Sequence, residues 1–141
     1  MAFLLDTNVI SETRRPRPNR RVMEWFAGLS SSAVFLSVIS LGEVHRGILK
    51  ARMAAPHRVA DLERWLDGLE QSYAATILTI DSRASKRWAE LRHRHPNGDV
   101  EDLLIAATAS AHGLTVATRN VRDFQDLGIP LFNPFEPGGP P

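Results

Sequence analysis

The stretch VEDLLIAATASAHGLTVATRNVRDF, residues 100–124, says the most about how this chain folds. Its apolar residues recur at helical spacing over about 100–112, and Gly113 follows as a typical helix end. The segment LTVAT, residues 114–118, has the short apolar and β-branched pattern of a strand, and we expect a short helix over 121–127. A helix, a strand and a second helix in this order are typical of an α/β protein.

The same alternation extends toward both ends of the chain. Short apolar segments predict further strands at residues 2–5, 33–39, 76–80 and 129–132. Apolar residues at helical spacing predict helices at residues 8–13, 19–29, from Ser40 to about Arg52, from Pro56 to about Tyr73, and 82–94. Strands that alternate with helices favour an α/β fold with a mostly parallel central sheet flanked by helices.

Length and composition indicate one globular domain. The chain has 141 residues, 43% of them hydrophobic, and we expect a single domain over 1–135 with a Gly/Pro-rich tail at 136–141. It has no cysteine, which excludes a disulfide scaffold, a thiolate metal site and a cysteine nucleophile. A net charge of +1 excludes a strongly basic nucleic-acid-binding arm. Because no signal peptide or membrane-spanning run is recognisable, we expect a cytoplasmic protein without membrane attachment.

Four acidic residues lie near the carboxyl ends of the predicted strands, where parallel sheets form their functional sites. Asp6 ends the first predicted strand, Glu43 follows the second, and Asp123 follows LTVAT, while Asp102 lies one turn into the helix that precedes that strand. Four carboxylates about 6 Å apart would repel one another by roughly 17 kcal/mol at an effective dielectric of 20. A hard cation such as Mg²⁺ or Mn²⁺ would relieve that repulsion, and oxygen ligands suit it.

Each of these acids also has a purely structural explanation. Glu43 follows Ser40 at the spacing of a capping box, and Asp6 is placed to cap the helix that follows it. Asp102 near a helix start is favoured by the helix dipole, and Asp123 fits a solvated surface position. It is their common placement at strand ends that favours a shared site.

The residues around the acids resemble the PIN domain, and specifically the VapC-type ribonuclease toxins of bacterial toxin–antitoxin pairs. The matching stretches are FLLDTNVISE (3–12), SVISLGEVHRGI (37–48), DLLIAATASAHGLTVATRNVRDF (102–124) and GIPLFNPF (128–135). They cover both ends of the chain and most of the predicted strands. The middle helices have no distinctive match.

The resemblance implies a function and a set of site residues. It implies RNA cleavage dependent on Mg²⁺ or Mn²⁺, homodimers, and neutralisation by a small VapB-like antitoxin. It makes Asp6, Glu43, Asp102 and Asp123 the catalytic, metal-binding acids, with Thr118 and Asn120 as supporting polar residues. A metal-bound water would then attack the scissile phosphate without a protein nucleophile.

The third acid stands in a crowded segment, because Asp99 and Glu101 lie beside Asp102. On a helix, Asp99 and Asp102 share a face, whereas Glu101 is rotated by about 100° from Asp102. We therefore expect Asp102 to bind the metal and Asp99 to cap the helix, and whether Asp99 also assists Asp102 is open.

Three arginines are candidates for binding the phosphates of RNA. Arg46, Arg119 and Arg122 lie near the acids in the sequence, and the arginine fork suits phosphate. A solvated surface position explains any one of them equally well.

Two other functions fit part of the sequence. A phosphoacceptor signalling domain of the receiver type would use Asp81, which follows the predicted strand 76–80. It usually needs paired acids after the first strand and a lysine after the last, and this chain has neither. A non-catalytic PIN-like module that only binds RNA or a partner is the second, although the presence of all four acids counts against it.

Overall fold

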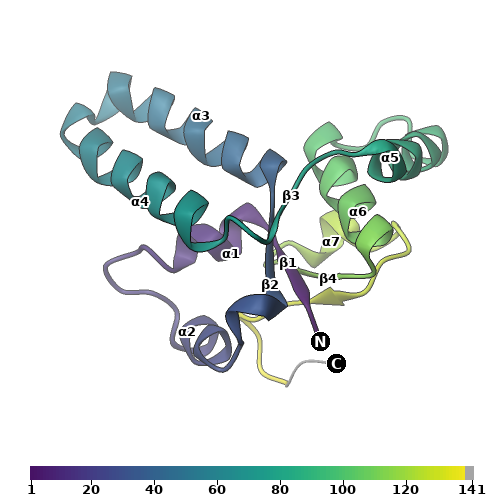
Figure 1. Ribbon diagram of the computed structural model, residues 1–141, viewed down its shortest axis with the longest axis horizontal. Helices are drawn as coiled ribbons and strands as arrows, with labels where there is room; N and C mark the ends of the chain where they lie inside the picture. The colour runs from purple at the N-terminus through teal and green to yellow at the C-terminus, as the bar shows by residue number, and fades with distance from the viewer. Residues whose placement is uncertain (139–141) are drawn as a thin grey trace.

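The computed structural model describes residues 1–138, and its centre is a parallel sheet (Figure 1). The strand order is β3-β2-β1-β4-β5. In the register of the sheet, Leu4 of β1 lies between Phe35 of β2 and Val116 of β4. The strands are β1 (Phe3–Leu5), β2 (Val34–Ser37), β3 (Ile77–Leu78), β4 (Thr115–Ala117) and β5 (Leu131–Phe132). The predicted α/β fold with a parallel sheet is confirmed.

Helices cover both faces of this sheet. They are α1 (Thr7–Glu12), α2 (Arg20–Ala27), α3 (Val38–Ala54), α4 (Val59–Ser72), α5 (Ser82–Arg94), α6 (Val100–His112) and α7 (Val121–Phe124). Two short 3-10 helices precede β2 and α4, η1 (Ser31–Ala33) and η2 (Pro56–Arg58). No helix within residues 1–138 is long and apolar enough to cross a membrane.

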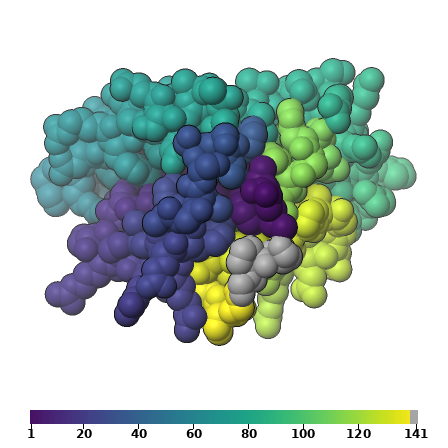
Figure 2. All heavy atoms as spheres, turned by 60° about the horizontal axis from the view of Figure 1, so that its bottom comes forward, coloured from purple at the N-terminus to yellow at the C-terminus, as the bar shows by residue number. Residues whose placement is uncertain are grey.

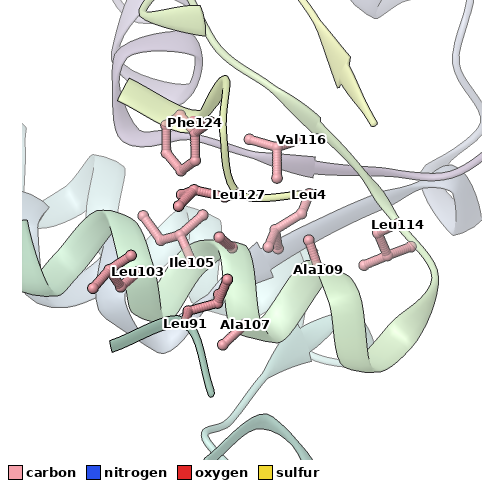
Figure 3. Packing of buried hydrophobic residues seen from close by; sticks show 11 residues of the cluster. Leu4, Leu91, Leu103, Ile105, Ala107, Ala109, Leu114, Val116, Phe124 and Leu127 are labelled. Atoms are coloured by element: carbon pink, nitrogen blue, oxygen red, sulfur yellow. The ribbon is translucent and has the colours of Figure 1, made fainter. Parts of the chain in front are cut away.

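The core has two layers because side chains alternate along β1. Leu4 faces α6 and α7, where it packs with Ile105, Val116 and Phe124 (Figure 3). Phe3 and Leu5 belong to a second cluster on the opposite face, which includes residues of α1 and α2. α6 approaches the sheet closely because its inward positions carry small residues, including the fully buried alanines 106, 107 and 109.

β1 therefore lies in the middle of the molecule, buried on both faces. Figure 2 shows the N-terminal residues between the segment around β2 on one side and the C-terminal third of the chain on the other. Parallel strands with both faces covered are apolar throughout, as FLL is at residues 3–5. This arrangement brings the carboxyl ends of β1, β2 and β4 to one edge of the sheet.

Local signals placed several helix ends correctly. α5 and α6 begin and end at the predicted residues, with Asp81 and Asp99 as their N-caps. Gly113 ends α6 in the left-handed conformation at φ 64°, which favours glycine. The side chain of Asn19 caps α2 by accepting from the N–H groups of Arg21 and Val22.

The junction between β2 and α3 differs from the prediction. We expected a strand over 33–39 and a helix from Ser40, but the strand ends at Ser37 and α3 begins at Val38. The hydroxyl of Ser37 caps the helix by accepting from the N–H of Ile39 at 3.0 Å. Ser40 is buried inside the first turns, so the alternative explanation of Glu43 as part of a capping box with Ser40 does not apply.

Other element boundaries also differ from the prediction. The strand expected at 76–80 is Ile77–Leu78, and the short helix expected over 121–127 ends at Phe124. α3 extends to Ala54, and Leu49, which we expected on its apolar face, is 45% exposed. The part of the predicted tail at 139–141 lies outside the described residues.

Candidate functional site

Asp6 accepts the most side-chain hydrogen bonds of the four acids within residues 1–138. It follows β1 and caps α1, and only 7% of its surface is exposed. Its Oδ1 accepts from the N–H of Thr7 at 2.8 Å, and its Oδ2 accepts from Asn8 Nδ2 at 3.2 Å and Thr118 Oγ1 at 2.8 Å. Burial raises the pKa of the Asp6 carboxyl, these hydrogen bonds oppose the rise, and the charge of Asp123 adds to it.

Thr118 links Asp6 to the end of β4. Its side chain is fully buried, and its hydroxyl donates to Asp6 while accepting from the N–H of Asn120 at 3.0 Å. The amide side chain of Asn120 makes no hydrogen bond with the described residues. Thr118 therefore contacts Asp6 through its side chain, whereas Asn120 contacts Thr118 through its backbone N–H.

Glu43 reaches the same place from α3. Its Oε1 accepts from the hydroxyl of Thr7 at 3.1 Å. Burial is the main cause that raises the pKa of the Glu43 carboxyl, and the charges of Asp6, Glu101 and Asp99 add to it. Thr7 thus connects two acids that are far apart in the sequence, with its N–H on Asp6 and its hydroxyl on Glu43.

Asp102 lies in the first turn of α6 and is half-buried. Burial, followed by the charges of Asp99, Asp6, Asp123 and Glu43, raises its pKa to about 7. Asp99 is the N-cap, and its Oδ1 accepts from the N–H of Asp102 at 3.0 Å. The structure agrees with the capping role expected for Asp99.

Asp123 completes the group from α7. Its side chain is exposed, and its N–H donates to the carbonyl of Asn120 at 3.0 Å. Its charge contributes to the raised pKa of both Asp6 and Asp102. The fold therefore brings the four predicted acids together at the carboxyl edge of the sheet, and within residues 1–138 none of them forms a salt bridge.

The donor set suits a hard cation by its chemistry. All four side chains offer carboxylate oxygen, which Mg²⁺ and Mn²⁺ prefer, and no salt bridge in the described part of the chain offsets their mutual repulsion. As the side chains stand in residues 1–138, no three histidine, aspartate or glutamate groups are arranged to hold a metal together. Mg²⁺ commonly binds through one or two carboxylates and keeps several waters, so the arrangement fits such an ion.

Two of the four acids, Glu43 and Asp102, line a groove between α3 and α6. Its volume is about 470 Å³, and its polar lining is Glu43, Arg46, Asp99, Glu101 and Asp102. Arg46 is exposed at the edge of this groove, close to the acids as expected. The groove therefore has carboxylates on both sides and one cation, Arg46, in its lining.

The other two candidate arginines lie around α7. Arg119 and Arg122 line a shallow depression together with Asp123. The guanidinium carbon of Arg119 lies 4.3 Å from the centre of the Phe135 ring, which orients its side chain.

Thr7 and Asn8 are site residues that were not predicted from the sequence. Asn8 donates to Asp6 and accepts from the N–H of Arg119 at 3.2 Å, so it ties β1 to the loop after β4. The available signal was the run DTN at residues 6–8, in which three polar side chains directly follow a buried strand.

Asp81, the phosphoacceptor in the receiver interpretation, has a different position. It is exposed and caps α5, where its Oδ1 accepts from the N–H of Ala84 at 2.9 Å. It is absent from the charges that raise the pKa of Asp6, Glu43 or Asp102. The geometry therefore gives Asp81 a capping role.

The class of protein follows from this fold and from the sequence. Residues 3–130 match the PIN domain family, and the chain belongs to this family. The chain is similar to the toxin FitB of Neisseria gonorrhoeae, with 37% identity over 137 residues that cover 94% of this chain and 98% of FitB. It is also similar to the VapC ribonuclease Y4jK of Sinorhizobium fredii, with 37% identity over 140 residues, 96% of this chain and 99% of the relative.

A solved structure extends the likeness to three dimensions. The structure of FitAB bound to an IR36 DNA fragment contains a chain with 32% identity and a TM-score of 0.80. The match covers 97% of this chain and 98% of that one.

Proposed function

We propose that this protein is the ribonuclease toxin of a toxin–antitoxin pair and that it cleaves RNA with the help of Mg²⁺ or Mn²⁺. The observation that carries the proposal is the group of Asp6, Glu43, Asp102 and Asp123 at the carboxyl edge of the sheet. Burial and neighbouring acids raise the pKa of Asp6, Glu43 and Asp102, and within residues 1–138 no salt bridge pairs any of the four. Relatives that align over nearly the whole chain are named a toxin and a ribonuclease, which supports the same function.

The four acids would hold the cation, and their neighbours orient them. Thr118, Asn8 and the N–H of Thr7 fix both oxygens of Asp6, and the hydroxyl of Thr7 fixes Glu43. Hydrogen bonds of this kind hold a carboxylate in its charged form and in one orientation. The metal site is therefore largely pre-organised on its β1 side.

A bound Mg²⁺ or Mn²⁺ supplies a water of lowered pKa and polarises the scissile phosphate. The chain has no cysteine, and its own contribution is to bind the cation and orient the RNA. Arg46, at the edge of the acidic groove, and Arg119 and Arg122, beside Asp123, are placed to bind neighbouring phosphates.

The partner is a small cognate antitoxin of the VapB type. The relative FitB is named a toxin, and its structural counterpart is the complex FitAB on a DNA fragment. An antitoxin that covers the acidic edge of the sheet would block RNA and cation together. We further infer that the protein acts as a homodimer in the cytoplasm, where its RNA substrates are.

Cleavage of a labelled RNA by the purified protein tests the function. We expect cleavage with Mg²⁺ or Mn²⁺, none in EDTA, and loss of both cleavage and calorimetric Mn²⁺ binding in Asp6→Asn. Asp81→Asn is the matched control, because it changes an exposed acid that caps a helix, and it should cleave like the wild type. Cleavage that persists in EDTA would refute the metal, and a protein that binds RNA without cleaving it would be a non-catalytic module.

A further inference from the structure

A second groove begins beside the acids and runs between α1, α3 and α4. Figure 1 shows α3 and α4 side by side, with α1 beneath them. The groove has a volume of about 320 Å³, and Thr7 and Glu43 form the end that adjoins the acidic site. Glu43 lines both grooves, so a ligand held at the acids can continue into this one.

The charge of this second groove is opposite to that of the acidic site. Its lining contains the cations Arg14, Lys50 and Arg58, and its single acid is Glu43. Within residues 1–138 these three cations form no salt bridge, whereas the nearby Arg15 and Arg52 pair with Glu12 and Glu63. Unpaired cations that share one groove call for an anionic ligand.

Of the three groove cations, Arg14 is the one whose side chain is oriented by an aromatic contact. Its guanidinium carbon lies 5.3 Å from the centre of the Trp65 ring, a cation–π arrangement that orients the side chain. Burial, followed by the charges of Arg58 and Arg15, lowers the pKa of Arg14. The two groove arginines therefore repel each other across the groove, and an anion between them would relieve that repulsion.

Glu12 holds the segment that carries Arg14. Its carboxylate is buried and accepts from the N–H of Asn19 at 2.8 Å, and it lies 3.6 Å from Nε of Arg15. The turn between α1 and α2 is thereby closed by a side chain that faces inward. These contacts of Glu12 with Asn19 and Arg15 hold the chain on the C-terminal side of Arg14 in place.

We propose that this groove binds the part of a single-stranded RNA next to the scissile phosphate, with Arg14, Lys50 and Arg58 as its phosphate contacts. The proposal rests on the ribonuclease function argued above. A groove that starts at the metal-binding edge and carries several unpaired cations fits a chain with one anionic group in every nucleotide. The half-buried Leu62 on the groove wall gives the bases and sugars an apolar surface to contact.

Binding without cleavage tests the proposal. The probe is a 5′-fluorescein 12-nucleotide RNA of mixed sequence, and the readout is fluorescence anisotropy in EDTA at several salt concentrations. We expect Lys50→Gln and Arg58→Gln each to weaken binding by roughly threefold to fivefold, the value of one partly screened ion pair. The slope of the logarithm of the binding constant against the logarithm of salt should fall by about 0.7 for each lost contact.

The control variant is Lys86→Gln, which removes the same charge from an exposed position on α5, away from the groove. It should bind RNA like the wild type, and thermal unfolding should show that all the variants are folded. Unchanged affinity in Lys50→Gln and Arg58→Gln, or a wild type that binds no RNA at low salt, overturns the proposal.

The same assay separates this groove from the ribonuclease function and from an acidic peptide ligand. Cleavage with Mn²⁺ is measured on the same proteins: a wild type that binds RNA through the groove but never cleaves it refutes the ribonuclease alone. Normal cleavage by variants with unchanged RNA affinity refutes the groove alone. A 12-residue polyglutamate that binds more tightly than the RNA, and loses its affinity in Arg58→Gln, assigns the groove to an acidic peptide and overturns the proposal.

Discussion

The hydroxyl of Thr118 donates to the Oδ2 of Asp6 over 2.8 Å and joins residues that are 112 positions apart in the sequence. The same hydroxyl accepts from the N–H of Asn120, so its hydrogen is committed to the carboxylate. This bond opposes the effect of burial, which raises the pKa of Asp6. Among the hydrogen bonds of Asp6, this one has the largest lowering effect on its pKa, and its donor directly follows β4.

Replacement of Thr118 tests this effect. In Thr118→Val the carboxylate loses a donor, so the pKa of Asp6 should rise further and Mn²⁺ affinity should fall by about tenfold, as for other residues that orient metal ligands. Titration calorimetry at pH 7 measures the affinity. Thr118→Ser keeps the hydroxyl and should stay close to the wild type, and equal affinity in the valine and serine variants would show that the hydroxyl has no such role.

The acidic residues around the start of α6 should separate into two roles. Asp102→Asn should reduce cleavage by more than about 100-fold and weaken Mn²⁺ binding, because it removes a carboxylate from the metal site. Asp99→Asn should cost about 1 kcal/mol of unfolding free energy or less, since asparagine also caps helices, and Glu101→Gln should do little. Cleavage assays and urea unfolding measure both effects. Loss of activity in Asp99→Asn with normal activity in Asp102→Asn would exchange the two roles.

Helix ends with a strong local signal were predictable from the sequence. α5 and α6 begin after the capping residues Asp81 and Asp99, and α6 ends at Gly113, because caps and left-handed glycines act within a few residues. The start of α3 was mispredicted because VFLSVI continues the apolar pattern of a strand after the chain has turned helical. Ser37 and Ser40 both resemble caps, and only tertiary packing, which buries Ser40, decides between them.

For the site, the sequence predicts where the acids lie but not which side chains hydrogen-bond to them. The positions of Asp6, Glu43 and Asp123 at one edge follow from strand ends, since parallel strands end at one edge of a sheet, and that of Asp102 follows from the helix that leads into β4. The hydrogen bonds of Thr7 and Asn8 could not be predicted in this way, because they depend on which side chain faces Asp6, Glu43 or the loop at Arg119. The unpaired cations of the second groove also come from segments that meet only in the folded chain.

Two glycines should respond to alanine in opposite directions. Gly113 has a φ of 64°, so Gly113→Ala should destabilise the protein by about 1 kcal/mol although the Cβ meets no atom within 4 Å. Gly68 lies inside α4, and its Cβ would also meet nothing, so Gly68→Ala should stabilise by about 0.5–1 kcal/mol. Urea unfolding measures both. Equal effects would show that backbone conformation is not the cause.

The acidic site should make the stability of the metal-free protein depend on pH in an unusual direction. The folded-state pKa of Asp102 is about 7, above its ordinary value of 3.8, so between these values the folded state binds more protons than the unfolded state. Stability should therefore fall as the pH rises from about 4 through 7. Asp102→Asn should remove about 1–2 kcal/mol of this loss, less than the full pKa shift implies because solvent screens the half-buried carboxyl.

Urea unfolding in EDTA at pH 5 and pH 8 measures this dependence in the wild type and in Asp102→Asn. Saturating Mn²⁺ should reverse the trend, because the cation binds the deprotonated carboxylates and its affinity rises as the pH increases toward 8. The exposed Asp81→Asn variant should keep the wild-type pH dependence, since Asp81 is not among the charges that raise the pKa of Asp102. A metal-free protein that is more stable at pH 8 than at pH 5, with no change in Asp102→Asn, would show that the four acids do not repel one another as their positions indicate.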